Sequence, residues 1–237
     1  MRITHKTFFT HPAVIHFAGR HLVQVTSVFR GLASNAFANI TQQACEQITL
    51  LTWNNGSKDP KQRNLGTFEE SCGWFGQPIH ALGKGIDQFR LSQKTELVHE
   101  FLKHVSTPYI LAADSNDCIL LDYPVNILRE YLKHFSCEMV ISAGGNHPTN
   151  AELAAFEMSL PWARCVPLPG INSGSWIGRT EFVREYFSWC MERYHHLDDD
   201  QLQLRYGFRN FYPRVQIDYL RVLFHRWGDW NEVAWEI

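Results

Sequence analysis

The sequence has 237 residues, of which 45% are hydrophobic and 19% charged, a composition that argues for a sizeable core and against disorder. Its 22 Lys and Arg residues and 24 Asp and Glu residues give a net charge of −2, which excludes a broad attraction to nucleic acid or anionic membranes. The sequence opens without a secretion-signal pattern, and no apolar run approaches the ~20 residues that span a bilayer. The six cysteines are scattered, without metal or redox spacing. We therefore expect a cytoplasmic protein with reduced thiols and no transmembrane segment.

Apolar runs that end at turn residues alternate with segments of helical periodicity, which is typical of an α/β protein. In chain order, the sequence predicts a helix near 22–32, a strand at 47–53, a long Gly-rich loop with short helices at 54–92, a helix at 97–105, a strand at 109–113, a helix at 124–135, a strand at 138–143, a helix at 180–190 and a strand at 215–218. Pro124 suits a first helical position, and Thr180 is a predicted N-cap. The pattern favours a three-layer α/β/α fold with a mostly parallel central sheet.

Asp114 and Asp117 directly follow the predicted strand 109–113. Ligands of open α/β sheets bind beyond the carboxyl ends of strands, and two carboxylates on a tight turn can converge on one divalent cation. Such a cation would stabilise a departing diphosphate. The alternative is a solvated turn, in which Asp114 caps the residues that follow.

Two further segments carry candidate functional residues. The run Asp198-Asp199-Asp200 concentrates negative charge, which a cation or hydrogen-bond donors would have to compensate. The alternative is that one of these aspartates caps a helix at 200–206. Small residues around Asn172-Ser173-Gly174 allow a ligand to approach the backbone closely. An ordinary turn into a strand explains this second segment nearly as well.

Several motifs in this order resemble the glycosyltransferase domain of procollagen lysyl hydroxylases and related proteins. The matching segments are Ala112-Ala113-Asp114-Ser115-Asn116-Asp117, Ile141-Ser142-Ala143, Ile171-Asn172-Ser173-Gly174 with Ile177-Gly178, Asp198-Asp199-Asp200-Gln201-Leu202 and Ile217-Asp218 with Leu223-Phe224. The resemblance covers about residues 47–235. It implies a GT-A (Rossmann-like) fold that binds a nucleotide-diphosphate sugar, in this family a UDP-sugar, through Mn²⁺ (or Mg²⁺).

The resemblance also assigns roles to individual residues. It implies that Asp114 and Asp117 bind the metal and that Asp199 and Asp200 face the reacting centre as catalytic residues. The implied substrate-binding residues are Thr52, Lys94, Ser115, Asn172, Ser173, Gly174, Gln201 and Gly19. The family often has Tyr where Asn116 stands, so the resemblance leaves the nucleotide base open.

The family's third metal ligand is a histidine near the C-terminal end of the domain, which has no counterpart there in this sequence. The N-terminal segment 7–19, which contains His16, resembles that part of the family instead. We therefore predict a circular permutation of one domain spanning 1–237, in which 1–46 includes the permuted segment and His16 is a metal ligand. The alternative is an ordinary strand histidine.

Together, these observations predict a metal-dependent glycosyltransferase that transfers a sugar from a nucleotide-diphosphate donor to a hydroxyl of a glycan or protein. Two alternatives remain open. A sugar nucleotidyltransferase would use a similar sheet and metal, with a basic phosphate loop for which 54–58 is a thin candidate. A non-catalytic glycan-binding module would retain the fold alone, but clustered carboxylates would then only cost stability.

Overall fold

The computed structural model describes residues 2–6, 8–17, 23–56, 66–145, 150–166, 169–226 and 233–236. The described strands are β1 (Arg2–His5), β2 (Val14–His16), β3 (Ile48–Trp53), β4 (Ile79–Leu82), β5 (Tyr109–Ala113), β6 (Cys118–Leu120), β7 (Met139–Gly145), β8 (Gly170–Arg179), β9 (Val215–Asp218), β10 (Phe224–Arg226) and β11 (Val233–Glu236). The described helices are α1 (Val23–Phe37), α2 (Thr67–Trp74), α3 (Gln93–Leu102), α4 (Pro124–His134), α5 (Ala151–Ser159), the short 3-10 helix η1 (Ala163–Cys165), α6 (Thr180–Tyr194) and α7 (Asp200–Phe211).

The central sheet has six strands in the order β4-β3-β5-β8-β7-β9. Neighbours pair in parallel at β4–β3, β3–β5 and β7–β9, whereas β8 runs antiparallel to both β5 and β7. The predicted mixed α/β class with a mostly parallel sheet is confirmed. The antiparallel β8 is the feature that brings the segment 171–178 back along the strand that precedes Asp114.

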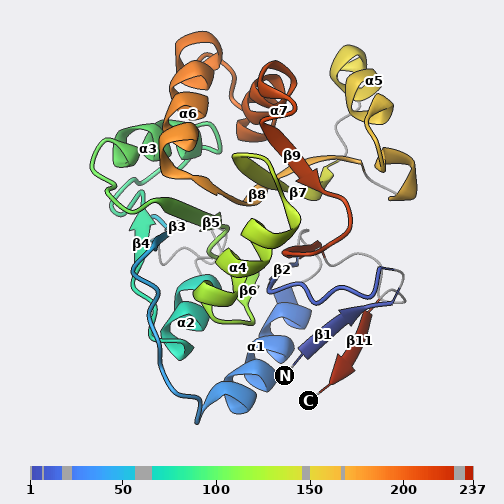
Figure 1. Cartoon of the computed structure of the whole chain (residues 1–237). Coiled ribbons are helices and arrows are strands. Elements are labelled where there is room, and N and C mark those ends of the chain that lie inside the picture. Colours follow the sequence, from blue (N-terminus) through green and yellow to red (C-terminus); the bar gives the residue numbers. More distant parts are fainter. Residues whose placement is uncertain are drawn as a thin grey trace.

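Helices cover both faces of this sheet, as Figure 1 shows, with α3, α6 and α7 on one side and α2 and α4 on the other. Alternate residues along a strand enter opposite cores: Leu50 and Leu111 pack toward α2 and α4, whereas Leu51 and Ile110 pack toward α3 and α6. Strands buried on both faces are nearly continuous in apolar residues. This explains why the sequence shows apolar runs there instead of polar–apolar alternation.

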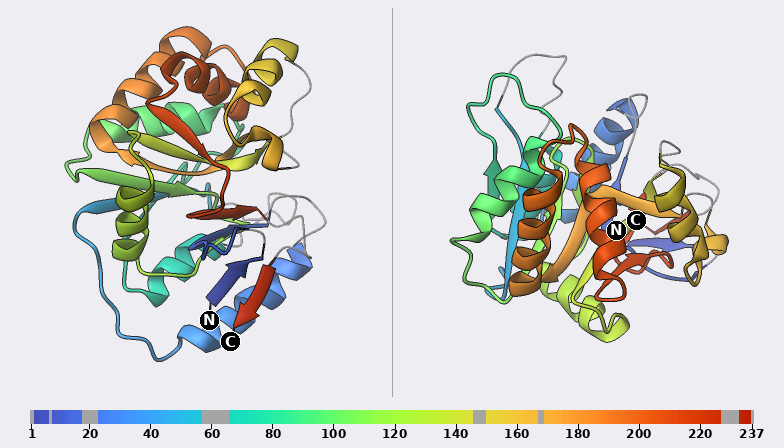
Figure 2. Two further views of the ribbon diagram at one scale, coloured as in Figure 1. Left: turned by 45° about the vertical axis from the view of Figure 1, so that its right-hand side comes forward. Right: turned by 90° about the horizontal axis from the view of Figure 1, so that it is seen from above.

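A second, three-stranded sheet lies beside the central one, in the order β10-β2-β6. Strand β2 is parallel to β10 and antiparallel to β6, so the N-terminal segment lies between two strands from much later in the chain. The β1–β11 pair places the two ends of the described chain side by side (Figure 2). Neighbouring ends are the geometric condition for a circular permutation, which stays a prediction.

Most predicted elements are present, with differences in detail. The sequence predicts Thr180 as the N-cap of α6, but Arg179 occupies that position and its side chain makes no capping hydrogen bond. Leu32 and Leu132, which the periodicity places on buried helix faces, are 50% and 46% exposed. The segment 54–92 contains α2 and β4, although 57–65 lie outside the described residues. None of the helices described here is long and apolar enough to cross a bilayer.

Candidate metal and substrate site

His16, Asp114 and Asp117 meet at the edge of the central sheet where β5 ends. Asp114 follows β5, Asp117 precedes β6, and His16 is the last residue of β2. The Nε2 atom of His16 lies 3.3 Å from Oδ2 of Asp117 and 3.6 Å from Oδ2 of Asp114. The β2–β6 register sets this geometry because it pairs His16 with Cys118, the residue after Asp117. The fold therefore brings together the three predicted metal ligands.

Gly174 forms a wall of this site. The register of β8 against β7 shifts between Asn172 and Trp176, so the residues between them form a bulge toward β5. The backbone amide of Asp114 donates to the Gly174 carbonyl at 2.8 Å. A Cβ atom at this position would lie 2.6 Å from Oδ2 of Asp114 and would also clash with the ring of His16. Bulges of this kind often adjoin functional sites, and here only glycine leaves the metal-ligand side chains their space.

Lys94 provides positive charge next to these carboxylates. Its Nζ atom donates to Oδ1 of Asp114 at 2.6 Å and lies 3.6 Å from Oδ2 of Asp200. The ammonium group also lies over the ring of Trp53, 5.1 Å from its centroid, which is a cation–π contact. Because the Lys94 side chain is only 12% exposed, these charges interact in a poorly solvated environment.

The charges of the site shift one another's pKa values. Burial lowers the pKa of Lys94, but Asp114 and Asp200 raise it more, so the net pKa lies above its usual value. Burial also lowers the pKa of His16, while Asp117 and Asp114 raise it above the usual histidine value. Burial raises the pKa of Asp117, but the nearby charges, above all His16, lower it by more. The net pKa of Asp117 therefore lies below its usual value. The carboxylates thus raise the pKa values of Lys94 and His16, whereas burial leaves the pKa of Asp114 itself above its usual value. A divalent cation bound by oxygen and imidazole ligands would stabilise the same negative charge.

Ser115 takes part in a hydrogen-bond network that supports the loop between Asp114 and Asp117. Its hydroxyl lies 2.8 Å and 2.9 Å from the two carboxylate oxygens of Glu69, which also accepts from Nδ2 of Asn54 at 2.7 Å. Glu69 is not among the predicted site residues, because nothing in the sequence pattern of α2 distinguishes it from an exposed helix residue. Ser115 is buried, so its role in this structure is to attach the loop to α2.

The two predicted catalytic aspartates have different surroundings. Asp199 is the N-cap of α7, and its Oδ1 accepts from the backbone amide of Leu202 at 3.0 Å. Asp200 is the first residue of α7, is buried, and directs Oδ2 toward Lys94. Asp198 is 85% exposed and lies 3.8 Å from Nη1 of Arg90 on the surface. Asp199 thus caps α7 through one carboxylate oxygen while its predicted catalytic role stays a prediction, and Asp200 belongs to the charged site.

The bulge of β8 is connected to the start of α7. Oε1 of Gln201 accepts from the backbone amide of Ser173 at 3.4 Å, and the amide oxygen of Asn172 accepts from the backbone amide of Gly174 at 2.8 Å. Asn172 and Ser173 are more than nine-tenths buried. The predicted substrate-binding segments 172–174 and 199–201 are thus neighbours, and together they border the Asp114 side of the site.

Thr52, a predicted substrate-binding residue, does not join this arrangement. Thr52 has no exposed surface, and its hydroxyl donates to the Ala113 carbonyl at 2.7 Å, which links β3 to β5. The predicted contact of Thr52 with a substrate would need surface that this residue does not expose. Gly19 lies outside the described residues, as do residues 57–58 of the thin candidate for a phosphate loop at 54–58.

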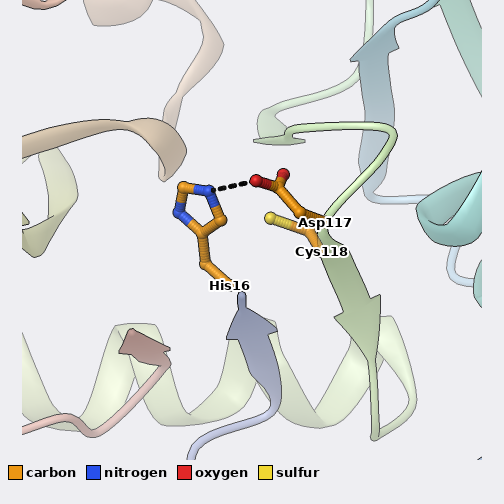
Figure 3. Close-up of side chains that lie close together, drawn as sticks. All are labelled: His16, Asp117 and Cys118. Carbon is orange, nitrogen blue, oxygen red and sulfur yellow. Dashed lines mark ion pairs between the residues drawn. The ribbon is translucent and has the colours of Figure 1, made fainter. Parts of the chain in front are cut away.

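Cys118 is a further member of the site that the sequence patterns do not indicate. In Figure 3 its sulfur lies beside the His16 ring and the Asp117 carboxylate. The ligand atoms of His16, Asp117 and Cys118 all lie within 4.8 Å of one another, and within the described ranges they are the one group of three metal-ligating side chains this close. Burial raises the pKa of the Cys118 thiol well above its usual value. A lone cysteine without a spacing motif gives no signal in the sequence, so only the fold reveals it.

No known protein family and no curated protein matches this sequence. Among solved structures, the chain resembles the crystal structure of a glycosyltransferase involved in the glycosylation of the major capsid of PBCV-1. That similarity has a TM-score of 0.45 and 13% sequence identity, and it covers 75% of this chain and 92% of that chain. Similarity at this level establishes no family. The motif resemblance to the lysyl hydroxylase glycosyltransferase domain therefore stays a prediction.

Proposed function

We propose that this protein is a metal-dependent glycosyltransferase that moves a sugar from a nucleotide-diphosphate donor to a hydroxyl acceptor. The observation that supports the proposal most directly is the convergence of His16, Asp114 and Asp117 beyond the carboxyl end of β5. This is the position at which open α/β sheets bind their ligands. Two carboxylates and an imidazole form a ligand set that suits a divalent cation, with Mn²⁺ or Mg²⁺ as the ions that the motifs imply.

The residues around the cation would divide the remaining tasks. A bound divalent cation would neutralise the donor's diphosphate and stabilise it as a leaving group. Lys94 would hold Asp114 in position through its 2.6 Å hydrogen bond and add positive charge near the phosphates. Asp200, which lies 3.6 Å from the Lys94 ammonium group, would favour the positive charge that develops on the sugar in the transition state. Asp199 would fix the start of α7, and so the position of Asp200.

Substrate recognition follows from the same surroundings. The bulged segment 172–174 would contact the donor sugar, because it borders the cluster and its backbone can approach a ligand closely. We propose UDP as the nucleotide on the strength of the motifs, and a glycan or protein hydroxyl as the acceptor.

Calorimetric titration of UDP, with and without Mn²⁺, tests the donor site. We expect Mn²⁺-dependent UDP binding in the wild type that weakens by at least about tenfold in Asp117→Ala, the scale on which metal sites respond to the loss of a supporting group. Asp198→Ala is the matched control, because it removes the same charge from a side chain that is 85% exposed. The proposal would be contradicted if the affinity for UDP were the same with and without Mn²⁺ and the same in the wild type and in Asp117→Ala.

The reaction itself separates the proposal from its rivals. Incubation with UDP-sugars and Mn²⁺ should release UDP, slowly by hydrolysis without an acceptor and faster with one. A nucleotidyltransferase would instead form pyrophosphate from UTP and a sugar phosphate. Binding of UDP-sugars without any turnover would indicate a module that only binds glycans.

A further inference from the structure

The thiol of Cys118 lies in a position from which it can reach the same cation. Cys118 is the first residue of β6 and pairs directly with His16 in the antiparallel β2–β6 register. Residues directly opposite each other in an antiparallel pair project from the same face of the sheet. The sulfur and the imidazole therefore project together into the site, as Figure 3 shows.

The distances place Cys118 in the closest group of ligand atoms at this site. The group whose ligand atoms all lie within 4.8 Å of one another consists of His16, Asp117 and Cys118. Asp114 uses Oδ1 for Lys94 at 2.6 Å, and its Oδ2 lies 3.6 Å from His16. Asp114 is thus already compensated by an ammonium group. The thiol makes a long contact with the Gly174 carbonyl, at 3.8 Å.

We propose that Cys118 is a ligand of the cation held by His16 and Asp117, so that the site prefers thiophilic ions such as Zn²⁺, Co²⁺ or Cd²⁺ to Mn²⁺ or Mg²⁺. On binding, the thiol gives its proton to solvent and the sulfur lone pair forms the bond to the cation. Thiolate and imidazole select softer ions, whereas an all-oxygen site suits Mg²⁺ and Mn²⁺. This inference rests on the metal site of the proposed function and specifies its ion.

Ultraviolet difference spectroscopy during titration with Cd²⁺ tests the sulfur bond without using activity. The wild type should develop a thiolate-to-Cd²⁺ charge-transfer band at one equivalent, and Cys118→Ser should not. Cys190→Ser is the matched control, because Cys190 is also fully buried and makes a similarly long contact, 3.6 Å, with the Gln203 carbonyl. Its spectrum should equal that of the wild type.

Affinities add a second readout. Because protein sites generally bind Zn²⁺ more tightly than Mn²⁺, absolute affinities do not report on the sulfur, and the informative quantity is how Cys118→Ser changes the affinity for each ion. We expect Cd²⁺ binding to weaken by at least about tenfold and Mn²⁺ binding by much less. Circular dichroism checks that the variant is folded, and Cys118→Ala replaces it if serine at this buried position is not tolerated.

The outcomes separate this inference from the proposed function. A charge-transfer band that persists in Cys118→Ser, or equal weakening of Cd²⁺ and Mn²⁺ binding, would overturn the role of Cys118. Wild-type protein that binds Mn²⁺ and UDP but shows no band with Cd²⁺ would overturn it too, while the proposed function stands. Protein that binds neither Cd²⁺ nor Mn²⁺ would refute the metal site itself.

Discussion

Position 174 shows how one residue without a side chain can determine a site. The bulge in β8 brings this backbone against Asp114, and a methyl group there would overlap Oδ2 of Asp114 and the His16 ring. Those are the atoms that face the proposed cation. Close-packed protein interiors tolerate an added methyl group poorly when the neighbours cannot move apart.

We therefore expect Gly174→Ala to abolish Mn²⁺-dependent UDP binding and to cost about 1–3 kcal/mol of stability through overpacking. Isothermal calorimetry and urea denaturation measure the two effects. The control is Gly31→Ala in α1, where an added Cβ meets nothing within 4 Å. That helical substitution should stabilise the protein by about 0.5–1 kcal/mol and leave binding unchanged. Normal UDP binding by Gly174→Ala would show that the wall formed by this glycine is dispensable.

At the scale of elements, α7 matters because its first turn carries Asp200 and Gln201. Two ion pairs join α7 to α5, and they differ in burial. Arg205 and Glu157 form a bidentate pair at 2.7 Å and 2.8 Å, with both side chains almost completely buried. Arg209 and Glu152 join the same helices at 2.6 Å on the surface, where they are 41% and 70% exposed.

These pairs predict contrasting effects of the same substitution. Glu157→Gln leaves the buried guanidinium of Arg205 without its carboxylate, and we expect a loss of about 3 kcal/mol of stability. Glu152→Gln should produce no measurable change, because exposed pairs are screened by water and salt. Urea denaturation of both variants measures the difference. If the two variants were equally stable, burial would not determine how much an ion pair between α5 and α7 contributes to the stability of the protein.

The sequence predicts individual elements better than their neighbours in space. The predicted strands 109–113 and 215–218 match β5 and β9, and α4 begins at Pro124 as expected. Periodicity and turn residues are local signals, so they mark where elements begin and end. The direction of β8 and the three-stranded sheet depend on pairing between distant segments, which leaves no local pattern. Exposed Leu32 and Leu132 show the same limit for helix faces.

For the whole molecule, the residues of the candidate site also divide into those that local sequence patterns predict and those that only the tertiary structure reveals. Asp114 and Asp117 are visible in the sequence because a strand and a turn position them locally. His16 was predicted only through a family resemblance, and the fold places it within 3.6 Å of both carboxylates. Glu69 and Cys118 have no sequence signal, since their roles arise from helix packing and from strand register. Residues that one strand and its turn position can therefore be predicted from the sequence. The remaining residues of the site can be identified only from the tertiary structure.

Because His16 enters from the N-terminal segment and the two aspartates from the middle of the chain, a cation would link distant parts of the fold. A ligand that binds only the folded state stabilises it by about 2.7 kcal/mol at 100 times its Kd. For a chain of this size, that free energy corresponds to an increase in Tm of roughly 5–10 °C. We expect saturating Mn²⁺ to produce such a shift in the wild type and in the surface variant His195→Ala, and little shift in His16→Ala. Differential scanning calorimetry with and without Mn²⁺ compares each variant with itself, so a lower starting Tm of His16→Ala does not affect the comparison. An equal shift in His16→Ala would mean that the cation binds without the N-terminal segment, and the predicted permutation would lose its functional basis.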